Sequence, residues 1–168
     1  MDFLVSLESS AFAEWLQFSA FAYPMIESTH VLGVALLFGT LLIVDLRLVG
    51  IRLMSQSISS ITHATLKWTW LGFALALVTG LMMFSERATH YITNFEFLSK
   101  MGLLGLAGAN MLVFEFLTRR SLAAWDTGQP IPGKVKLAGY LSLAFWIGVI
   151  IFGRLIGFAE AHDPLASL

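Results

Sequence analysis

Four long apolar stretches, each with few charged side chains, dominate the pattern of this 168-residue chain. A helix rises about 1.5 Å per residue and the hydrocarbon core of a bilayer is about 30 Å thick, so roughly 20 apolar residues cross it. The stretches reach this length, and we place the spans at residues 25–47, 66–85, 99–118 and 136–158. The pattern predicts an all-α integral membrane protein, a four-transmembrane-helix bundle that forms one membrane domain over residues 1–168.

The residues before the first span have a two-sided pattern. Within residues 3–22, apolar side chains such as Leu4 and Trp15 recur at helical spacing, whereas serines and Glu14 fall on the other face. We expect an amphipathic interfacial helix on the outer membrane surface, which turns into the first span at Pro24. A mobile tail is the alternative. Because this segment has no Lys or Arg, it lacks the basic region of a signal peptide and is expected to stay on the mature protein.

Two polar stretches between spans are predicted to be plain connectors. Residues 55–65 are rich in Ser and Thr, and residues 126–133 carry a cluster of Gly and Pro. Neither is long enough to hold a soluble domain.

Composition supports a lipid environment and removes several classes of site. Hydrophobic residues make up 57% and charged residues 12% of the chain, and the mean hydropathy is +0.79. The chain has no cysteine, which excludes disulfides, thiolate metal sites and covalent haem attachment. A net charge of −1 argues against a nucleic-acid partner, because phosphate binding needs a concentrated basic surface.

The basic residues predict the orientation in the membrane. Seven of the ten flank two of the three loops, namely Arg47, Arg52, Lys67, Arg119, Arg120, Lys134 and Lys136. Short cytoplasmic loops carry the excess of positive charge. We therefore expect a multi-pass protein of the bacterial inner membrane with both termini on the periplasmic side.

Ionisable and polar residues gather toward the predicted outer face. They are Glu27 and His30 in the first span, Arg87, His90 and Asn94 in the outer loop, Lys100 at the start of the third span and Arg154 near the end of the fourth. A charge inside a span is costly unless it faces a cavity or a partner, so each is a functional candidate. Glu27 and His30 are three residues apart and share one face of their helix.

His30 has three possible roles. Neutral imidazole is the usual protein ligand for haem iron and for divalent transition metals. The alternatives are a hydrogen-bonded structural role and a proton relay with Glu27. If His30 is an axial ligand, His90 is the predicted second ligand.

Glycines and cations near His30 have two interpretations each. Gly33, Gly80, Gly102, Gly105 and Gly108 can leave room for a flat macrocycle or let helices pack closely, and Gly153-x-x-x-Gly157 is typical of close packing. Lys100, Arg154 and Arg87 can pair with haem propionates, or can reach lipid head groups or Glu27.

Other polar residues are interpreted as structural or as surface residues. Asp45 and Arg47 close the first span and, with Trp125-Asp126, are expected to be structural anchors. His63 and His162 are expected at the surface, and Glu160 with His162-Asp163 is a weak metal-binding candidate without a third ligand.

Several motifs resemble those of a group of uncharacterised bacterial inner-membrane proteins, a domain of unknown function. They are Ile26-Glu27-Ser28-Thr29-His30-Val31-Leu32-Gly33, Asp45-Leu46-Arg47, Trp68-Thr69-Trp70, the set Asn94, Phe97 and Lys100, and Ala124-Trp125-Asp126. The resemblance runs from Trp15 to Arg154 and brings no assigned activity.

More distantly, the chain is similar to the four-helix membrane units of copper-resistance protein D and of the haem-dependent bacterial protoporphyrinogen oxidase. In that oxidase a span-one His and a Lys at the start of span three serve haem binding and activity, so the similarity implies these roles for His30 and Lys100. The chain departs from the enzyme because no His precedes Lys100 and the loops do not match. The oxidase activity is therefore not carried over.

The leading hypothesis is a b-type haem-binding membrane protein in electron transfer, with the haem site toward the outer face and a redox partner there. Its alternatives are a small metal-ion or solute transport or metal-handling protein built on Glu27, His30 and Lys100, and an accessory subunit of a membrane complex. Either a homo-oligomer or a larger membrane complex is compatible with the glycine faces.

Overall fold

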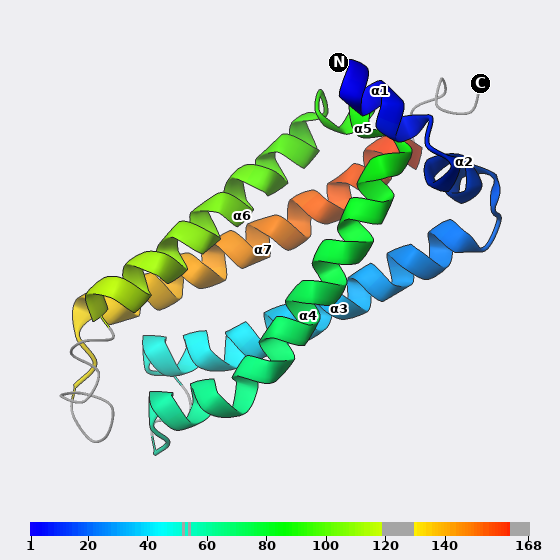
Figure 1. The fold of residues 1–168 in the computed structure, drawn as a ribbon. Helices are drawn as coiled ribbons and strands as arrows, with labels where there is room; N and C mark the ends of the chain where they lie inside the picture. Colours follow the sequence, from blue (N-terminus) through cyan, green and yellow to red (C-terminus); the bar gives the residue numbers. More distant parts are fainter. Residues whose placement is uncertain (52, 54, 119–129, 162–168) are drawn as a thin grey trace. The chain divides into compact units, whose positions relative to one another are not determined.

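The computed structural model describes the chain except for residues 52, 54, 119–129 and 162–168. Most of the described residues are helical, and none of them lies in a strand. In chain order the elements are α1 (Asp2–Glu8), α2 (Ala11–Phe18), α3 (Ala22–Val49), α4 (Ile58–Glu86), α5 (Ala88–Tyr91), α6 (Phe95–Val113), a π-helical turn at Phe114–Thr118 and α7 (Gly133–Ala161) (Figure 1).

Four helices are long and apolar enough to cross a bilayer, which confirms the predicted all-α architecture with four spans. They are Ala22–Val49, Ile58–Glu86, Phe95–Phe116 and Gly133–Phe158. A helix of this length and hydropathy is stable in lipid because its backbone polar groups are paired within it. Each helix begins before the residue at which the sequence places the corresponding span.

The start of α4 lies inside the stretch that was expected to be a connector. Its helix begins at Ile58, where the Ser57 hydroxyl accepts a hydrogen bond of 3.1 Å from the Ser60 backbone N–H. Ile58 and Ile61 are both buried. The connector prediction for residues 58–65 is therefore wrong, because a serine cap and burial of the first turn outweigh the polar composition.

The N-terminal segment forms two helices where one was expected. The helix is interrupted at Ser9-Ser10. The Ser10 hydroxyl caps α2 by accepting a hydrogen bond of 3.2 Å from the Ala13 N–H. Ala13 and Leu16 of α2 are buried, whereas Trp15 is 55% exposed, so α2 is two-sided. Its position on a membrane surface stays a prediction.

The turn into the first long helix also lies earlier than expected. The helix α3 begins at Ala22, whose N–H donates to the Ser19 hydroxyl at 3.2 Å. Pro24 therefore lies in the first helical turn, where a residue without an N–H is tolerated.

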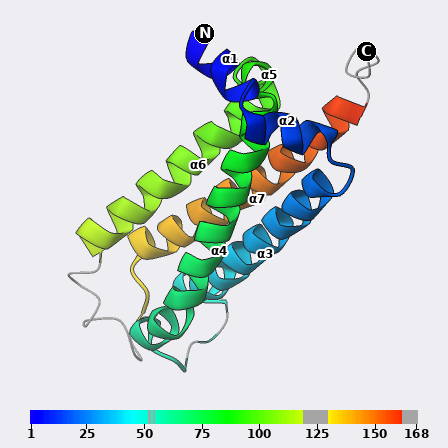
Figure 2. The same ribbon diagram turned by 45° about the vertical axis from the view of Figure 1, so that its right-hand side comes forward.

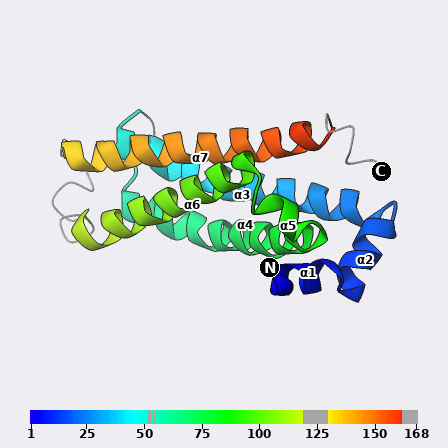
Figure 3. The same cartoon turned by 90° about the horizontal axis from the view of Figure 1, so that it is seen from above.

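The chain divides into two compact units, which are described separately. Unit 1 holds residues 1–41 and 63–94, and unit 2 holds residues 42–62 and 95–168. In unit 1, α3 runs antiparallel to α4 (Figure 2), and α1 and α2 lie beside α5 near the end of α4 (Figure 3). In unit 2, α6 and α7 form an antiparallel pair (Figure 1).

Unit 2 has a small apolar core and a polar contact between its two long helices. The core consists of Leu48, Ile58, Ile131 and Val135. Further along the pair, the Asn110 side-chain amide donates to the Ala138 carbonyl oxygen at 2.9 Å. The helices are joined there by a side-chain hydrogen bond as well as by packing.

Candidate functional site

His30 lies on the face of α3 that packs against α4. Its Nδ1 is 3.0 Å from the Thr79 hydroxyl oxygen, and both side chains are at least half-buried. Gly80 follows Thr79, and a β-carbon at Gly80 would lie 3.2 Å from Cε1 of His30. The absence of a side chain at Gly80 therefore lets the imidazole ring lie against α4.

The partners of Thr79 determine the tautomer of His30. The Thr79 hydroxyl donates its hydrogen to the Leu75 carbonyl oxygen of its own helix. Because a hydroxyl has one hydrogen to give, its oxygen must accept from His30, which places the ring proton on Nδ1. In the neutral imidazole the lone pair is then on Nε2, the atom that can ligate a metal or accept a proton.

A close approach of the two helix backbones holds His30 at this distance. A β-carbon on Gly72 would lie 2.6 Å from the backbone nitrogen of Leu37, and one on Gly33 would lie 2.8 Å from that of Ala76. Beyond the glycines, the hydroxyl oxygens of Thr40 and Thr69 are 2.9 Å apart. We call this contact the His30 seam; it consists of His30, Gly33 and Thr40 on α3 and Thr69, Gly72, Thr79 and Gly80 on α4.

Glu27 is not joined to His30, although the two lie one turn apart. The Glu27 side chain is exposed, and no hydrogen bond or ion pair links it to another described residue. The structure therefore does not assemble the Glu27–His30 pair that a proton relay or a two-residue metal site requires.

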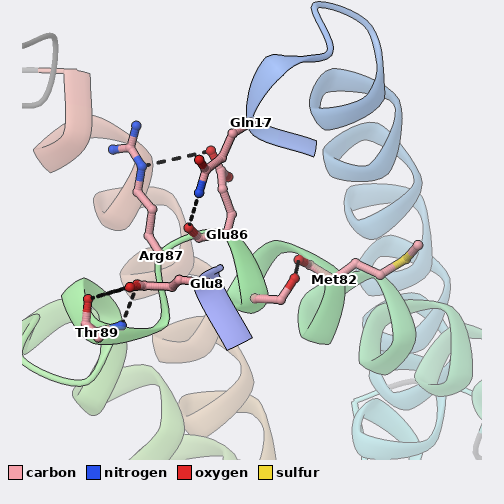
Figure 4. Close-up of polar contacts among 7 residues, drawn as sticks. Glu8, Gln17, Met82, Glu86, Arg87 and Thr89 are labelled. Carbon is pink, nitrogen blue, oxygen red and sulfur yellow. Dashed lines mark hydrogen bonds and ion pairs between the residues drawn. The ribbon is translucent and has the colours of Figure 1, made fainter. Parts of the chain in front are cut away.

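Arg87 lies beside a group of contacts that joins the N-terminal helices to the end of α4 and to α5. Glu8 accepts from the backbone N–H and the hydroxyl of Thr89, both at 2.8 Å, and the Gln17 amide donates to the Glu86 carbonyl oxygen at 2.9 Å (Figure 4). We call the contacts of Glu8, Gln17, Glu86 and Thr89 the N-terminal clasp. Sequence analysis missed it, because no local pattern links Glu8 to a residue 81 positions later.

Arg87 has an acidic neighbour in this clasp. Its Nε lies 3.9 Å from a carboxylate oxygen of Glu86 (Figure 4). An ion pair at that length on a partly exposed side chain is weak. Asn94 lies just before α6, where its backbone N–H donates to the Tyr91 carbonyl oxygen at 3.2 Å.

His90 lies at a different level of unit 1 from His30. Its side chain is exposed on α5, with its ring 6.0 Å from that of Tyr91. His30 instead contacts Thr79, which lies seven residues, or about 10 Å, before the last residue of α4, Glu86. The structure does not bring the two imidazoles together.

Lys100 and Arg154 lie in unit 2 at the same level of the α6–α7 pair. The Lys100 ammonium nitrogen is 3.7 Å from the position that a β-carbon on Gly153 would occupy. Arg154 is the next residue of α7, and its guanidinium carbon is 5.0 Å from the centre of the Phe158 ring. Lys100 thus lies beside Gly153, whereas the Arg154 guanidinium is directed along α7 toward Phe158.

Asp45 and Arg47 are buried, as expected of structural anchors. Arg47 is 1% exposed and its Nε donates to the Gln56 carbonyl oxygen at 2.9 Å. Asp45 is 5% exposed and shares a hydrogen bond with Ser142 of α7, while its Oδ2 has no hydrogen-bond partner in the described structure.

The remaining candidates are surface residues or lie outside the described residues. His63 is exposed, as expected. Trp125, Asp126, His162 and Asp163 are among the residues that the structure does not describe, and so is the side chain of Glu160. Within the described part of the chain, no three His, Asp or Glu side chains are placed to share a metal ion.

The glycines differ in what they contact. Gly33, Gly72 and Gly80 lie in close helix contacts, whereas a β-carbon on Gly102, Gly105, Gly108 or Gly157 would have no neighbour within 4 Å. Close packing therefore accounts for Gly33 and Gly80. The predicted close contact through Gly157 is not present among the described residues.

A protein-family model matches most of the chain. Residues 14–159 match the model of a family described as a family of unknown function, DUF6644. No curated protein and no solved structure matches the chain. The more distant similarity to copper-resistance protein D and to the haem-dependent protoporphyrinogen oxidase stays a prediction.

Proposed function

The chain belongs to the family of unknown function DUF6644, and from its own residues we propose that it is a membrane protein that binds haem b through Nε2 of His30 and serves electron transfer. The observation that supports the proposal is the hydrogen bond between Nδ1 of His30 and Thr79. Imidazoles that ligate a metal commonly give their second ring N–H to an acceptor, which orients the ring and selects the tautomer. Thr79 acts as this acceptor.

The surroundings of His30 are compatible with haem ligation in two further respects. The ring is half-buried on the face of α3 that packs against α4, and the absence of a side chain at Gly80 leaves room for the imidazole edge that carries Cε1 and Nδ1. When bound, haem b supplies one-electron redox chemistry, and the protein supplies a ligand, an orientation and an apolar environment.

The remaining parts of the proposal concern charge and location. Arg87, in the same unit as His30, is the cation proposed to neutralise a propionate, whereas Lys100 and Arg154 belong to the other unit and are not assigned to this site. His90 is not retained as the second axial ligand, because it lies exposed on α5 at a different level of unit 1 from His30. We further propose that the protein lies in the bacterial inner membrane with both termini on the periplasmic side. Its redox partner is proposed to bind on the periplasmic face.

Absorption spectroscopy tests the proposal directly. The protein is expressed with haem supplied, purified in mild detergent, and examined oxidised and dithionite-reduced, with haem quantified by the pyridine haemochrome method. We expect stoichiometric haem b in the wild type and its loss in His30→Ala. His63→Ala, which removes an exposed imidazole from α4, is the matched control and is expected to keep the haem.

Two results would overturn the proposal. One is a wild-type protein that stays colourless despite the haem supply, and the other is a folded His30→Ala variant with full haem content. Binding of copper or nickel that depends on Glu27 and His30 would instead indicate metal handling. Co-purification with a larger complex, without a cofactor, would indicate an accessory subunit.

A further inference from the structure

Asp45 carries a carboxyl group that is buried between two helices of unit 2. It lies on α3, one turn before that helix ends at Val49, and the residue is 5% exposed. Ser142 of α7 forms a hydrogen bond with the carboxyl group, whereas its Oδ2 has no hydrogen-bond partner in the described structure. Most buried polar atoms in folded proteins have a partner, so this oxygen requires an explanation.

The last turn of α3 lies directly against α7 beside the carboxyl group. A β-carbon on Gly139 of α7 would lie 3.0 Å from Cγ2 of Val49, 3.1 Å from Cβ of Leu48 and 3.3 Å from the Asp45 carbonyl oxygen. Leu48 and Val49 are both buried. The neighbours of the carboxyl group are therefore largely apolar, and they replace little of the hydration that an ionised carboxylate has in water.

No cation pairs with Asp45 among the described residues. Arg47 is two residues later on α3, about 200° around the helix, and its Nε donates to the Gln56 carbonyl oxygen. Residues 58–62 of α4, which belong to the same unit, include no titratable side chain. The other titratable side chains at this end of unit 2 that the structure describes are exposed, namely Glu115, Lys134, Lys136 and Tyr140.

The oxygen atoms around Asp45 indicate which ligand fits. Hard metal cations such as Mg²⁺ and Ca²⁺ take about six or more oxygen ligands. Around Asp45 the described side chains supply its own carboxyl group and the Ser142 hydroxyl, and no three His, Asp or Glu side chains of the described chain could share a metal ion. A proton needs one oxygen, and it removes the charge that burial makes unfavourable.

We infer that Asp45 is a proton-binding site, which holds its proton at neutral pH with Ser142 as its hydrogen-bond partner. This role goes beyond that of a structural anchor and does not depend on the haem proposal. An aspartate of the unfolded chain loses its proton at about pH 4, so at neutral pH the folded state alone keeps the proton. Its loss from the folded state leaves a buried charge without a partner and should destabilise the contact of α3 with α7.

Infrared spectroscopy of the full chain in detergent tests the inference. At neutral pH the wild type should show the C=O stretching band of a protonated carboxyl group, and Asp45→Asn should lack this band. Asp2→Asn, which removes an exposed carboxyl group, is the matched control and should keep the band. Ser142→Ala should keep the band at a shifted frequency, because it removes the hydrogen bond to the carboxyl group.

Thermal unfolding at a series of pH values gives a second readout. Where the folded state binds one proton more than the unfolded state, stability falls as the pH rises. The wild type should therefore lose stability relative to Asp45→Asn, by about 3–5 °C in midpoint for each pH unit over which only the folded state keeps the proton. Asp2→Asn should follow the wild type.

Three results would overturn the inference. They are a wild type without a band that Asp45→Asn removes, an equal pH dependence of unfolding in the wild type and Asp45→Asn, and a band that appears only when Na⁺ is replaced by choline, which would indicate a metal-cation site. Haem content is measured on the same samples. A haem-loaded protein without the band contradicts only the proton site, whereas a colourless protein with the band contradicts only the haem proposal.

Discussion

Gly33 and Gly72 face each other across the α3–α4 contact at a separation that leaves no room for a side chain on either. A β-carbon on Gly72 would lie 2.9 Å from the Gly33 carbonyl oxygen, and one on Gly33 would lie 3.2 Å from that of Gly72. The nearest atoms are backbone atoms, which cannot rotate away. This pair determines how closely His30 approaches Thr79 in unit 1.

Gly72→Ala should therefore destabilise the protein. The added carbon would lie 2.6 Å from the backbone nitrogen of Leu37, and overpacking of this kind costs about 1–3 kcal/mol. Thermal unfolding in detergent measures the change. Gly39→Ala on α3 is the control, because its β-carbon has no neighbour within 4 Å, and an equal loss in both variants would contradict the close contact.

Variants at Thr79 test whether its hydrogen bond orients the His30 ring for ligation, or whether burial of the ring is enough. Thr79→Val keeps the shape but removes the acceptor for Nδ1, and loss of such an acceptor lowers metal affinity by about 10–100-fold. Thr79→Ser keeps the hydroxyl and should behave like the wild type. Haem titration of the purified apoprotein gives both affinities. Equal affinities for Val and Ser at this position would show that the hydrogen bond does not orient a ligand.

The N-terminal clasp should depend on a single carboxylate. Glu8 accepts two hydrogen bonds from Thr89, so Glu8→Ala leaves a part-buried backbone N–H without its partner at a cost of about 1–3 kcal/mol. Residues 1–18 should then exchange amide hydrogens and be cleaved by protease faster. Glu14→Ala, at an exposed position of α2, should leave both rates unchanged. Unchanged rates in Glu8→Ala would mean that the clasp does not hold the N-terminal helices.

Ser142 should support the buried Asp45 carboxyl group. Ser142→Ala removes the one described hydrogen-bond partner of a side chain that is 5% exposed, and we expect a loss of about 1–3 kcal/mol in unfolding free energy. Ser28→Ala is the control, because the Ser28 hydroxyl is exposed and donates only within its own helix. Thermal unfolding in the same detergent compares the two variants. Similar unfolding midpoints for Ser142→Ala and Ser28→Ala would contradict a role for Ser142.

Local composition was enough to predict the four spans. Length and hydropathy of a single segment decide whether a helix can cross a bilayer, because the backbone must satisfy its own polar groups in lipid. The start of α4 could not be predicted in the same way. The helix begins at Ile58 because its first turn is buried, and that burial depends on contacts with other parts of the chain.

The sequence by itself determined which residue types were candidates, among them His30, Lys100 and Arg154, because ionisable groups stand out in apolar spans. Only the tertiary structure decided their neighbours, which are Thr79 for His30 and Gly153 for Lys100. It also decided that His90 is exposed and lies away from Thr79 and Gly80. Partners such as Thr79 lie 49 positions from His30, and helical periodicity reports only which residues share a face of one helix. Which face meets which neighbour is determined by packing, in this protein by the close approach of Gly33 and Gly72.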